Sequence, residues 1–399
     1  MNDYGYVVRK FVELYGGSEE GVRVFTSPGR VNLIGEHTDY NGGYVFPAAI
    51  EQSSIIALRR RDDGNKTIRL AATDLDDRVV IDINDIDASR SLKWGNYQAG
   101  VAYILRQEGY QICPCDILYH DEVPLGSGLS SSAAIEVVMA LALATLSNET
   151  NGIDGPVDMI KMAKLAQRAE NVFCGVSCGI MDQFASAMGR RDNAIFLDCK
   201  TLDFKYVPLV LRDYKIIIGN TKKKRSLAEG KYNERCAECK VALEQLRIAK
   251  PGAECLRDFS VDEFEDAKAL IQDDTCRIRA EHVIYECDRV LKSVQALRDG
   301  NLTDFGKLMT ASHISLRDLY EVTGPHLDCM VEQSLKVDGC IGSRMTGAGF
   351  GGCTVSIVKD SSVDGFIQTV GQAYTEKMGI VPEFYVSDAA DGAREIKLG

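Results

Sequence analysis

Hydrophobic and polar residues follow two different periods along this chain. Short runs rich in β-branched and aromatic residues predict strands at 22–25, 44–46, 54–58, 67–71, 79–83, 115–119, 194–197, 204–207, 215–219, 353–358 and 383–387. Apolar residues at helical spacing predict helices at 5–16, 94–108, 133–146, 157–173 and 362–378, and over most of 227–337. The charged segment 59–66 is typical of a hairpin connection between two strands. The pattern changes near Val207, where we place a candidate domain boundary.

A turn rich in glycine and serine joins the strand-like run 115–119 to the apolar helical run 133–146. It reads Pro124-Leu-Gly-Ser-Gly-Leu-Ser-Ser-Ser-Ala-Ala134. Glycines let backbone N–H groups approach a ligand closely, and the first N–H groups of a helix have no partner within it. These properties suit a phosphate, and the serines add hydroxyls for phosphate oxygens or for magnesium. The structural alternative is a glycine turn with serine N-caps on a core helix.

A second stretch concentrates polar side chains between glycines: Ser27-Pro-Gly-Arg-Val-Asn-Leu-Ile-Gly-Glu-His-Thr-Asp-Tyr-Asn-Gly-Gly43. It places the series Glu36, His37 and Asp39 within four residues. Such a series offers the donors and acceptors that sugar hydroxyls need, since each hydroxyl both gives and accepts hydrogen bonds. A solvated polar turn remains the alternative. A metal site is disfavoured, because three ligands so close in one loop rarely converge on one ion.

Two carboxylates stand out further along the chain. Asp182 lies among apolar residues, where its pKa responds strongly to burial and to nearby cations, and it is a candidate base or proton-orienting group. A helix N-cap at the same position is the alternative. Glu170 falls late in the predicted helix 157–173, where a carboxylate opposes the helix dipole. A cation partner would explain its presence, although a surface position would also do so.

A third glycine stretch, Gly342-Ser-Arg-Met-Thr-Gly-Ala-Gly-Phe-Gly-Gly352, contains the pattern GxGxxG at Gly347, Gly349 and Gly352. A dinucleotide-binding motif would be followed by a helix, but here the strand-like run 353–358 follows. A protein-kinase glycine loop is also excluded, since no HRD or DFG motif follows. A glycine loop that packs against another phosphate loop fits the pattern.

The composition of the chain argues against several classes of binding partner and of binding site. The net charge of −12 over 399 residues argues against nucleic acid as a partner. Thirteen scattered cysteines without a secretory signal predict reduced thiols in a cytoplasmic protein, and Cys236-Ala-Glu-Cys239 lacks the second pair of a zinc site. No segment is predicted to reach the apolar length that a bilayer requires, because even 133–146 carries Glu136. A membrane partner is therefore not expected.

The stretches 27–43, 124–134 and 342–352 resemble, in order and spacing, the three motifs of the GHMP small-molecule kinases, and 29–43 resembles the galactokinase signature. The resemblance runs through nearly the whole chain. It implies an α+β, two-domain fold with the active site between the domains. An N-terminal domain like ribosomal protein S5 domain 2 would span 1–207, and a ferredoxin-like C-terminal domain would span 208–399.

The resemblance also implies an activity and a set of site residues. The activity is ATP-dependent phosphorylation of the C1 hydroxyl of α-D-galactose to galactose 1-phosphate, the first committed step of galactose use by the Leloir pathway. The implied catalytic residues are Arg30 and Asp182. The implied sugar contacts are Glu36, His37, Thr38, Asp39 and Tyr232. The implied ATP-phosphate contacts are Gly126, Ser127, Gly128, Leu129, Ser130, Ser131 and Ser132. The implied Mg²⁺ ligands are Ser132 and Glu170.

In this scheme Asp182 accepts or orients the C1 proton, and Arg30 stabilises charge on the transferred phosphoryl group. Gly347 and Gly349 close over the nucleotide. Two other functions stay open. One is a sugar sensor that binds galactose and ATP without transfer, although the serine loop damaged in such relatives is intact here. The other is a kinase for N-acetylgalactosamine, arabinose or galacturonate. A monomer is the default oligomeric state.

Overall fold

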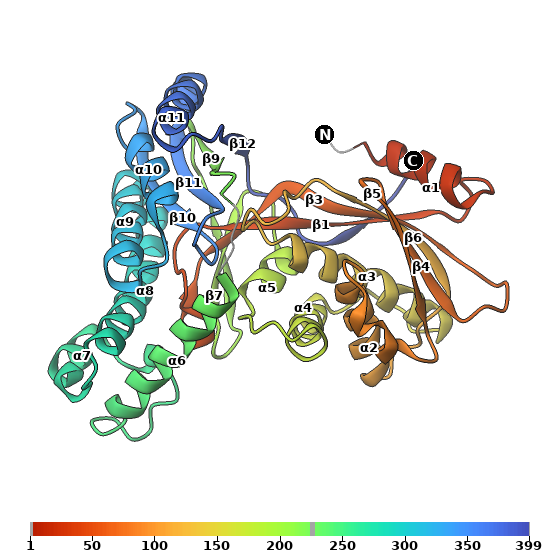
Figure 1. Cartoon of the computed structure of the whole chain (residues 1–399), viewed down its shortest axis with the longest axis horizontal. Coiled ribbons are helices and arrows are strands. Elements are labelled where there is room, and N and C mark those ends of the chain that lie inside the picture. Colours follow the sequence, from red (N-terminus) through yellow and green to blue (C-terminus); the bar gives the residue numbers. More distant parts are fainter. Residues whose placement is uncertain (1–2, 224–227, 399) are drawn as a thin grey trace.

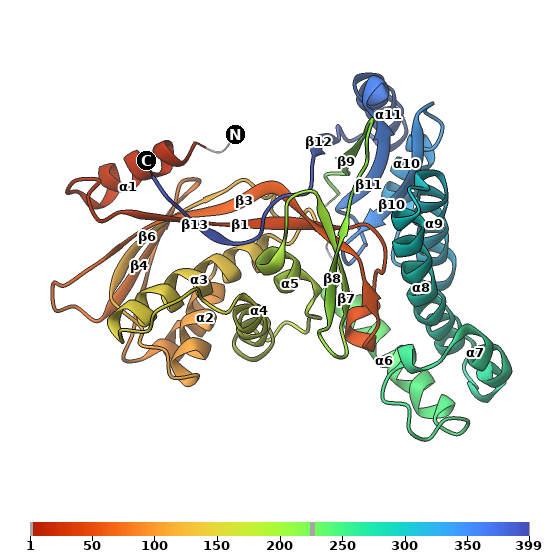
Figure 2. The same cartoon turned by 180° about the vertical axis from the view of Figure 1, so that it is seen from behind.

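The structure, a computed structural model, describes residues 3–223 and 228–398. Its first half, together with β13 from the end of the chain, forms a six-stranded sheet in the order β13-β1-β3-β6-β4-β5 (Figures 1 and 2). These strands are β1 Arg23–Asn32, β3 Pro47–Arg60, β4 Thr67–Ala72, β5 Leu75–Asp82, β6 Cys115–Asp121 and β13 Arg394–Ile396. All neighbours are antiparallel except β4 and β6.

Two details of this sheet differ from the sequence prediction. The segment 59–66 is not a hairpin connection, since β6 lies between β3 and β4 and pairs with both. The strand expected at 22–25 runs on to Asn32 as β1, because β3 continues to pair with it beyond a bulge between Pro28 and Arg30. The first part of the polar stretch 27–43 is therefore strand, which gives Arg30 a rigid base.

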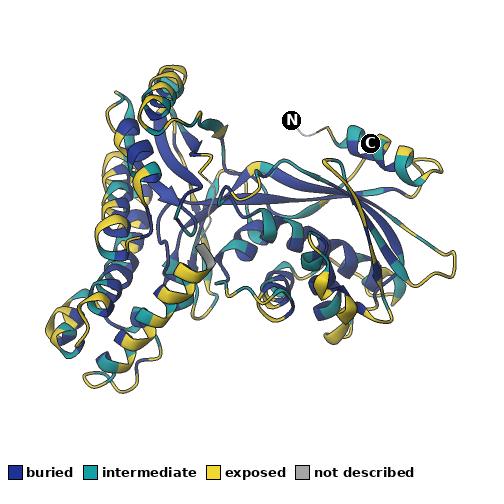
Figure 3. Cartoon of the chain, viewed as in Figure 1, coloured by how far each residue is buried: buried dark blue, intermediate teal, exposed yellow. Residues whose placement is uncertain are grey.

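Helices cover both faces of the sheet. The helix α1 (Tyr4–Tyr15) contacts β3 and β6 on one face. On the other face lie α2 (Asn96–Gln107), α3 (Ser131–Thr150), α4 (Met159–Arg168) and α5 (Met181–Met188), as Figures 1 and 2 show. The core lies between these helices and the sheet, and the long strands β1 and β3 are mostly dark blue in Figure 3.

The helix α3 corrects the prediction about membrane spans. By length and composition this 20-residue helix is apolar enough to cross a bilayer, with a mean hydropathy of 1.4. In the structure, 72% of that window is buried inside the protein. A helix that is apolar on every side is stable when other elements surround it, and α3 contacts β1, β3, α2, α4 and α5.

The second half contains a four-stranded antiparallel sheet in the order β10-β11-β9-β12. Its strands are β9 Tyr214–Asn220, β10 Cys340–Thr346, β11 Cys353–Lys359 and β12 Glu383–Ser387. The accompanying helices are α6 Ala228–Leu246, α7 Val261–Ala267, α8 Asp274–Arg298, α9 Leu302–Ser315, α10 Pro325–Ser334 and α11 Val363–Met378. Residue 227, where the helical pattern begins, lies outside the described residues. The α+β, two-domain expectation is confirmed.

A small three-stranded sheet and hydrogen bonds between β1 and β10 lie where the halves meet. The small sheet contains β2 Tyr44–Val45, β7 Asn193–Asp198 and β8 Phe204–Pro208. At the junction the end of β1 contacts β10, since Asn32 N donates to Thr346 Oγ1 (2.9 Å) and Arg344 Nη1 donates to Asn32 O (2.7 Å). We propose that the domain division near 207 falls between β8 and β9, with β13 returning to the first sheet.

Candidate active site

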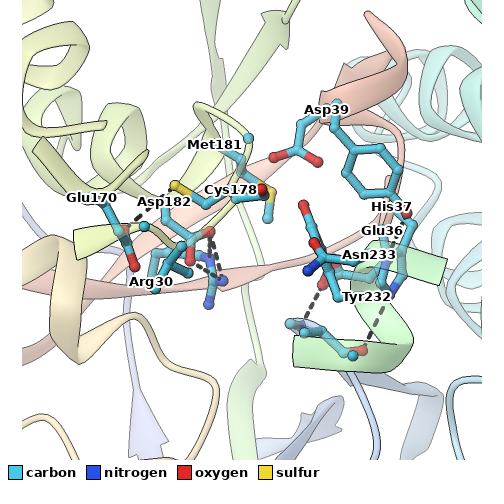
Figure 4. A pocket seen from close by; sticks show the side chains of 18 of the residues that line it. Arg30, Glu36, His37, Asp39, Glu170, Cys178, Met181, Asp182, Tyr232 and Asn233 are labelled. Atoms are coloured by element: carbon cyan, nitrogen blue, oxygen red, sulfur yellow. Dashed lines mark hydrogen bonds and ion pairs between the residues drawn. The ribbon is translucent and has the colours of Figure 1, made fainter. Parts of the chain in front are cut away.

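A cavity of about 780 Å³ lies where the two halves meet. It brings together residues from all three glycine stretches and from α5 and α6 (Figure 4). The predicted site residues among its lining are Arg30, Glu36, His37, Asp39, Gly126, Glu170, Asp182, Tyr232 and Gly347. Sequence reasoning did not single out several further lining residues, namely Tyr40, Tyr97, Val176, Ser177, Cys178, Asn233 and Ala348.

Arg30 and Asp182 form a two-point ion pair within this cavity. Arg30 Nε donates to Asp182 Oδ1 (2.9 Å), and Arg30 Nη2 donates to Asp182 Oδ2 (2.7 Å). Arg30 is 3% exposed, whereas the Asp182 side chain is 31% exposed and reaches the cavity. Asp182 is the second residue of α5, so the N-cap alternative is wrong. A bidentate Arg–carboxylate pair fixes both side chains and their orientation.

The turn 124–132 is shaped by left-handed residues, and among the described lining residues of the cavity Gly126 alone comes from this turn. Gly126 has φ +67°, Gly128 has φ +84°, and even Ser130 has φ +64°. Ser130 sits at the N-cap position of α3 without a side-chain capping bond, and its hydroxyl donates to Asp182 Oδ2 (2.6 Å). The alternative of serine N-caps is therefore wrong at Ser130. Gly128 O accepts a hydrogen bond from Arg30 Nη1 (2.6 Å), which ties this turn to β1.

The other side chains of this turn differ in their surroundings. Ser127 is 2% exposed and donates to Pro124 O (2.6 Å), while Leu129 is fully buried, so both shape the turn from inside. The buried hydroxyl of Ser131 has no hydrogen-bond partner among the described residues. Ser132 is half-buried in the first turn of α3. The helix N-terminus thus combines unpartnered N–H groups with hydroxyls, which suits a bound anion.

The polar series after β1 divides into pocket residues and structural residues. Glu36 and His37 line the cavity but are almost completely buried, at 1% and 5% exposure. Thr38 is fully buried and does not line the cavity, contrary to the expected sugar contact. Its hydroxyl lies 2.9 Å from Gly35 O and 2.7 Å from Tyr44 O, and it shapes the turn.

Asp39 faces the cavity against a glycine that leaves no room for a side chain. A Cβ at Gly179 would lie 1.7 Å from Asp39 Oδ2. Burial raises the pKa of Asp39 to about 7, and the nearby Asp182 carboxylate adds to the shift. The Tyr232 ring lies 5.8 Å from the His37 ring and 5.0 Å from the Tyr40 ring between centroids. Acidic acceptors and aromatic walls together suit a polyol.

Glu170 belongs to a buried carboxylate cluster. The predicted helix 157–173 ends as α4 at Arg168 and continues as a π-helical turn, Ala169–Cys174, which carries Glu170. Gln183 Nε2 donates to Glu170 Oε2 (2.7 Å) and to Glu136 Oε2 (3.0 Å). Among the described residues neither carboxylate forms an ion pair. Burial raises the pKa of Glu170 to about 7, and the charge of Asp182 raises it further.

Sequence reasoning noticed Glu136 only as a charged residue in an apolar helix and did not single out Gln183. The sequence did contain a signal for a buried polar cluster at Glu136. A lone carboxylate in a wholly apolar helix needs a polar partner when it is buried. Glu136 and Gln183 are both fully buried, and each retains one oxygen without a partner among the described residues. This cluster holds two buried carboxyl groups and oxygens without partners among the described residues, and it therefore suits a cation.

Comparisons with known proteins agree with this site. Family models match at residues 9–60 (galactokinase galactose-binding signature), 96–190 (GHMP kinases N terminal domain) and 293–376 (GHMP kinases C terminal). The chain is 47% identical over 388 residues to a galactokinase of Clostridium tetani, covering 97% of this chain and 96% of the relative. It is 45% identical over 384 residues to a galactokinase of Bacillus subtilis, covering 96% of each.

Solved structures give the same result. Lactococcus lactis galactokinase complexed with galactose matches with a TM-score of 0.93 and 40% identity, covering 99% of this chain and 100% of that one. The mevalonate kinase of Methanococcus jannaschii matches with a TM-score of 0.64 at 19% identity, covering 94% of this chain and 100% of that one, which shows the fold alone. The cavity geometry, the family models and these full-length relatives agree, and the chain belongs to the galactokinase family of the GHMP kinases.

Proposed function

We propose that this chain transfers the γ-phosphoryl group of ATP to the C1 hydroxyl of α-D-galactose, with the residues of the cavity in the roles given below. In the reaction the C1 oxygen forms a bond to the γ-phosphorus, and the bond between that phosphorus and the β–γ bridging oxygen breaks. The C1 proton leaves, and the products are galactose 1-phosphate and ADP. The observation that supports this proposal most directly is the two-point ion pair between Asp182 and Arg30 in the cavity.

Asp182 accepts the C1 proton or orients it. Its carboxylate is held by Arg30 from β1 and by Ser130 from the turn 124–132, so it cannot rotate away from the cavity. Arg30 neutralises charge on the transferred phosphoryl group while it keeps its partner in position. Phosphoryl transfer depends on in-line positioning and charge neutralisation more than on covalent help, and a fixed pair supplies both.

The sugar and the phosphates occupy different ends of the cavity in this proposal. Asp39, Glu36, His37 and Tyr232, which line the cavity, surround the galactose. The ATP phosphates lie at Gly126, which also lines the cavity, and along the backbone of 126–132 at the N-terminus of α3. Gly126 is open to the cavity, because a Cβ there would meet nothing within 4 Å, and its φ of +67° favours glycine. The turn thus offers backbone N–H groups without a side chain in the way.

Mg²⁺ fits the cluster around Glu170. Magnesium prefers one or two carboxylates together with substrate phosphates, and it would supply charge neutralisation on the β- and γ-phosphates. Glu170 and Ser132 would hold it. The buried Glu170 carboxyl, which forms no ion pair among the described residues, supports this assignment. We expect Glu170→Gln to weaken Mn²⁺ binding by about tenfold or more in the presence of ADP, measured by electron paramagnetic resonance. Unchanged Mn²⁺ binding would contradict it.

The experiment that tests this function is ATP consumption with a panel of sugars and Mg²⁺ present, followed by NMR assignment of the phosphorylated carbon. Turnover with galactose and phosphate on C1 in the α configuration supports the proposal. Turnover only with another sugar, such as N-acetylgalactosamine, would change the proposed substrate. The proposed phosphoryl transfer would stand. Binding of galactose and ATP without turnover would overturn the enzymatic assignment.

We also propose a monomeric, cytoplasmic enzyme without a nucleic-acid or membrane partner. All thirteen cysteines are free thiols, as a reducing compartment would keep them. All three glycine stretches of this chain contribute to its own cavity, which supports an active site built within one subunit. Analytical ultracentrifugation across the working concentration range tests the oligomeric state.

A further inference from the structure

Two consecutive side chains of the sugar stretch bond to two consecutive residues of the third glycine stretch. Gly347 N donates to Glu36 Oε1 (2.6 Å), and Ala348 O faces His37 Nε2 (3.2 Å). The partners are 311 residues apart in the sequence. In Figure 4 Glu36 and His37 lie together on one wall of the cavity. All four residues line that cavity.

Glu36 is fixed from several sides. Its second oxygen, Oε2, accepts a hydrogen bond from Asn32 Nδ2 (2.9 Å). Arg344 Nη1 lies 3.7 Å from Oε1, and the hydroxyl of Thr346 lies 3.4 Å from it. Burial raises the pKa of Glu36, and the charge of Arg344 opposes that shift. Because both oxygens already have partners, the carboxylate cannot turn away from Gly347 without leaving buried donors unsatisfied.

The hydrogen bonds around His37 determine which nitrogen carries the proton. A carbonyl oxygen only accepts, so Nε2 donates to Ala348 O, and Nδ1 accepts from Tyr40 OH (3.0 Å). The Tyr40 oxygen then accepts from Tyr320 OH (2.7 Å), and the Tyr320 oxygen accepts from the Cys239 thiol (3.2 Å). This chain of hydrogen bonds runs from the Cys239 thiol through Tyr320, Tyr40 and His37 to the carbonyl oxygen of Ala348. Burial lowers the pKa of His37 to about 3, so the ring is neutral.

The third glycine stretch is anchored at its far end by other elements. Phe350 N donates to Val322 O (2.7 Å), and Gly352 O accepts from Thr221 N (3.0 Å) and from the Thr221 hydroxyl (2.6 Å). Gly347 and Gly349 have φ values of +84° and +83°, which belong to the left-handed region. The described bonds that hold Gly347 and Ala348 themselves come from Glu36 and His37.

We propose that Glu36 and His37 are positioning residues that hold the Gly347–Ala348 segment in place for the nucleotide, in addition to their place beside the sugar. The proposal rests on the proposed function for its two substrates and on the place over the nucleotide that the family resemblance implies for Gly347. Its consequence is that the sugar stretch sets the affinity for the nucleotide even when no sugar is bound. Tyr40 contributes by fixing the tautomer of His37.

The test compares backbone amide exchange and ADP affinity in the absence of sugar. His37→Phe keeps a ring but removes the donor to Ala348. Glu36→Ala removes the acceptor of Gly347, whereas Glu36→Gln keeps an acceptor oxygen. Mass spectrometry follows exchange in peptides that contain 345–351, and calorimetry measures ADP. Asp39→Asn is the matched control, because Asp39 lies on the same sugar wall and its described hydrogen bonds come from Tyr40 and Met181.

We expect exchange in 345–351 to be about tenfold faster in His37→Phe and Glu36→Ala, and ADP to bind about fivefold more weakly to each. Glu36→Gln should lie between the parent and Glu36→Ala. Asp39→Asn should match the parent in both measurements while it loses galactose affinity. Parent-like exchange and ADP affinity in His37→Phe would overturn the proposal. If Glu36→Ala does not fold, the result for His37→Phe is sufficient to test the proposal. Unchanged galactose affinity in Asp39→Asn would instead count against the proposed function.

Discussion

The hydroxyl of Ser130 lies 2.6 Å from Oδ2 of Asp182 and donates to it. Ser130 has φ +64°, so the chain turns back toward α5 just before α3 begins. Arg30 bonds the same carboxylate from β1. Three elements that are distant in the sequence therefore meet at one carboxylate. The carboxylate gains a fixed orientation toward the cavity, which a catalytic base requires.

Ser130→Ala should reduce kcat by about tenfold or more while the KM for galactose changes little. A hydrogen bond to a charged group is worth about 1.5–3 kcal/mol, and its loss leaves the Asp182 carboxylate held by Arg30 alone. Steady-state kinetics with saturating ATP tests this. An unchanged kcat with a raised KM for ATP would assign Ser130 to the nucleotide instead.

Arg30→Ala should reduce kcat by on the order of 10³-fold, because it removes the cation that neutralises the transferred phosphoryl group. Arg30→Lys keeps the charge but not the two-point geometry to Asp182, so we expect an intermediate loss. Kinetics with both substrates varied separates the effects. A rise in KM alone would show that Arg30 only binds substrate.

Gly179→Ala should abolish or strongly weaken galactose binding. The new methyl group would lie 1.7 Å from Asp39 Oδ2, so this carboxylate must leave its place in the sugar wall. Gly230→Ala is the matched control, since Gly230 also lines the cavity and a Cβ there meets nothing within 4 Å. Calorimetry with galactose compares the two variants. Equal affinities would show that Asp39 can move without cost to the sugar.

Asp39 makes the stability of the fold depend on pH. Burial raises its pKa in the folded chain to about 7, compared with about 3.9 in an unfolded chain. Between these values the folded chain binds a proton that the unfolded chain has lost, so stability falls as pH rises from about 4 to about 7. The slope from this one group is at most about 1.4 kcal/mol per pH unit.

Asp39→Asn removes that dependence. The variant should be more stable than the parent above about pH 7, and its advantage should shrink as the pH falls toward about 4. Urea denaturation at pH 5 and pH 8 measures the difference. A gain that is the same at both pH values would show that Asp39 titrates normally in the folded chain.

The motif residues converge in the structure largely as the sequence predicts, because glycines and polar side chains crowded between apolar runs have few roles other than binding. Asp39, Asp182 and Tyr232 meet in one cavity although they come from separate elements. The sequence alone does not show that Thr38, unlike its neighbours Glu36, His37 and Asp39, has a structural role in the turn. Its hydroxyl satisfies the carbonyls of the turn, and only the folded backbone reveals that need.

The other differences between the predicted and the observed strands arise from pairing between strands that are distant in the sequence. β6 enters between β3 and β4, and β13 joins β1 from the end of the chain, so neither pairing has a local signal. β10 contains the first residues of the third glycine stretch, and Gly342 among them obscures its strand pattern. Its backbone packs against Gly306 of α9, where a Cβ would approach Ile341 O to 2.0 Å. Such close contacts depend on the tertiary structure.

The most direct test of the account measures turnover and ligand binding in Asp182→Ala. We predict that turnover falls by at least about 10³-fold. ADP should still bind with parent-like affinity by calorimetry, because the turn 126–132 and α3 hold the phosphates. Turnover within about tenfold of the parent would contradict the role of Asp182. Loss of nucleotide binding in a folded variant would contradict it as well, since Asp182 would then support the nucleotide site and not the C1 proton.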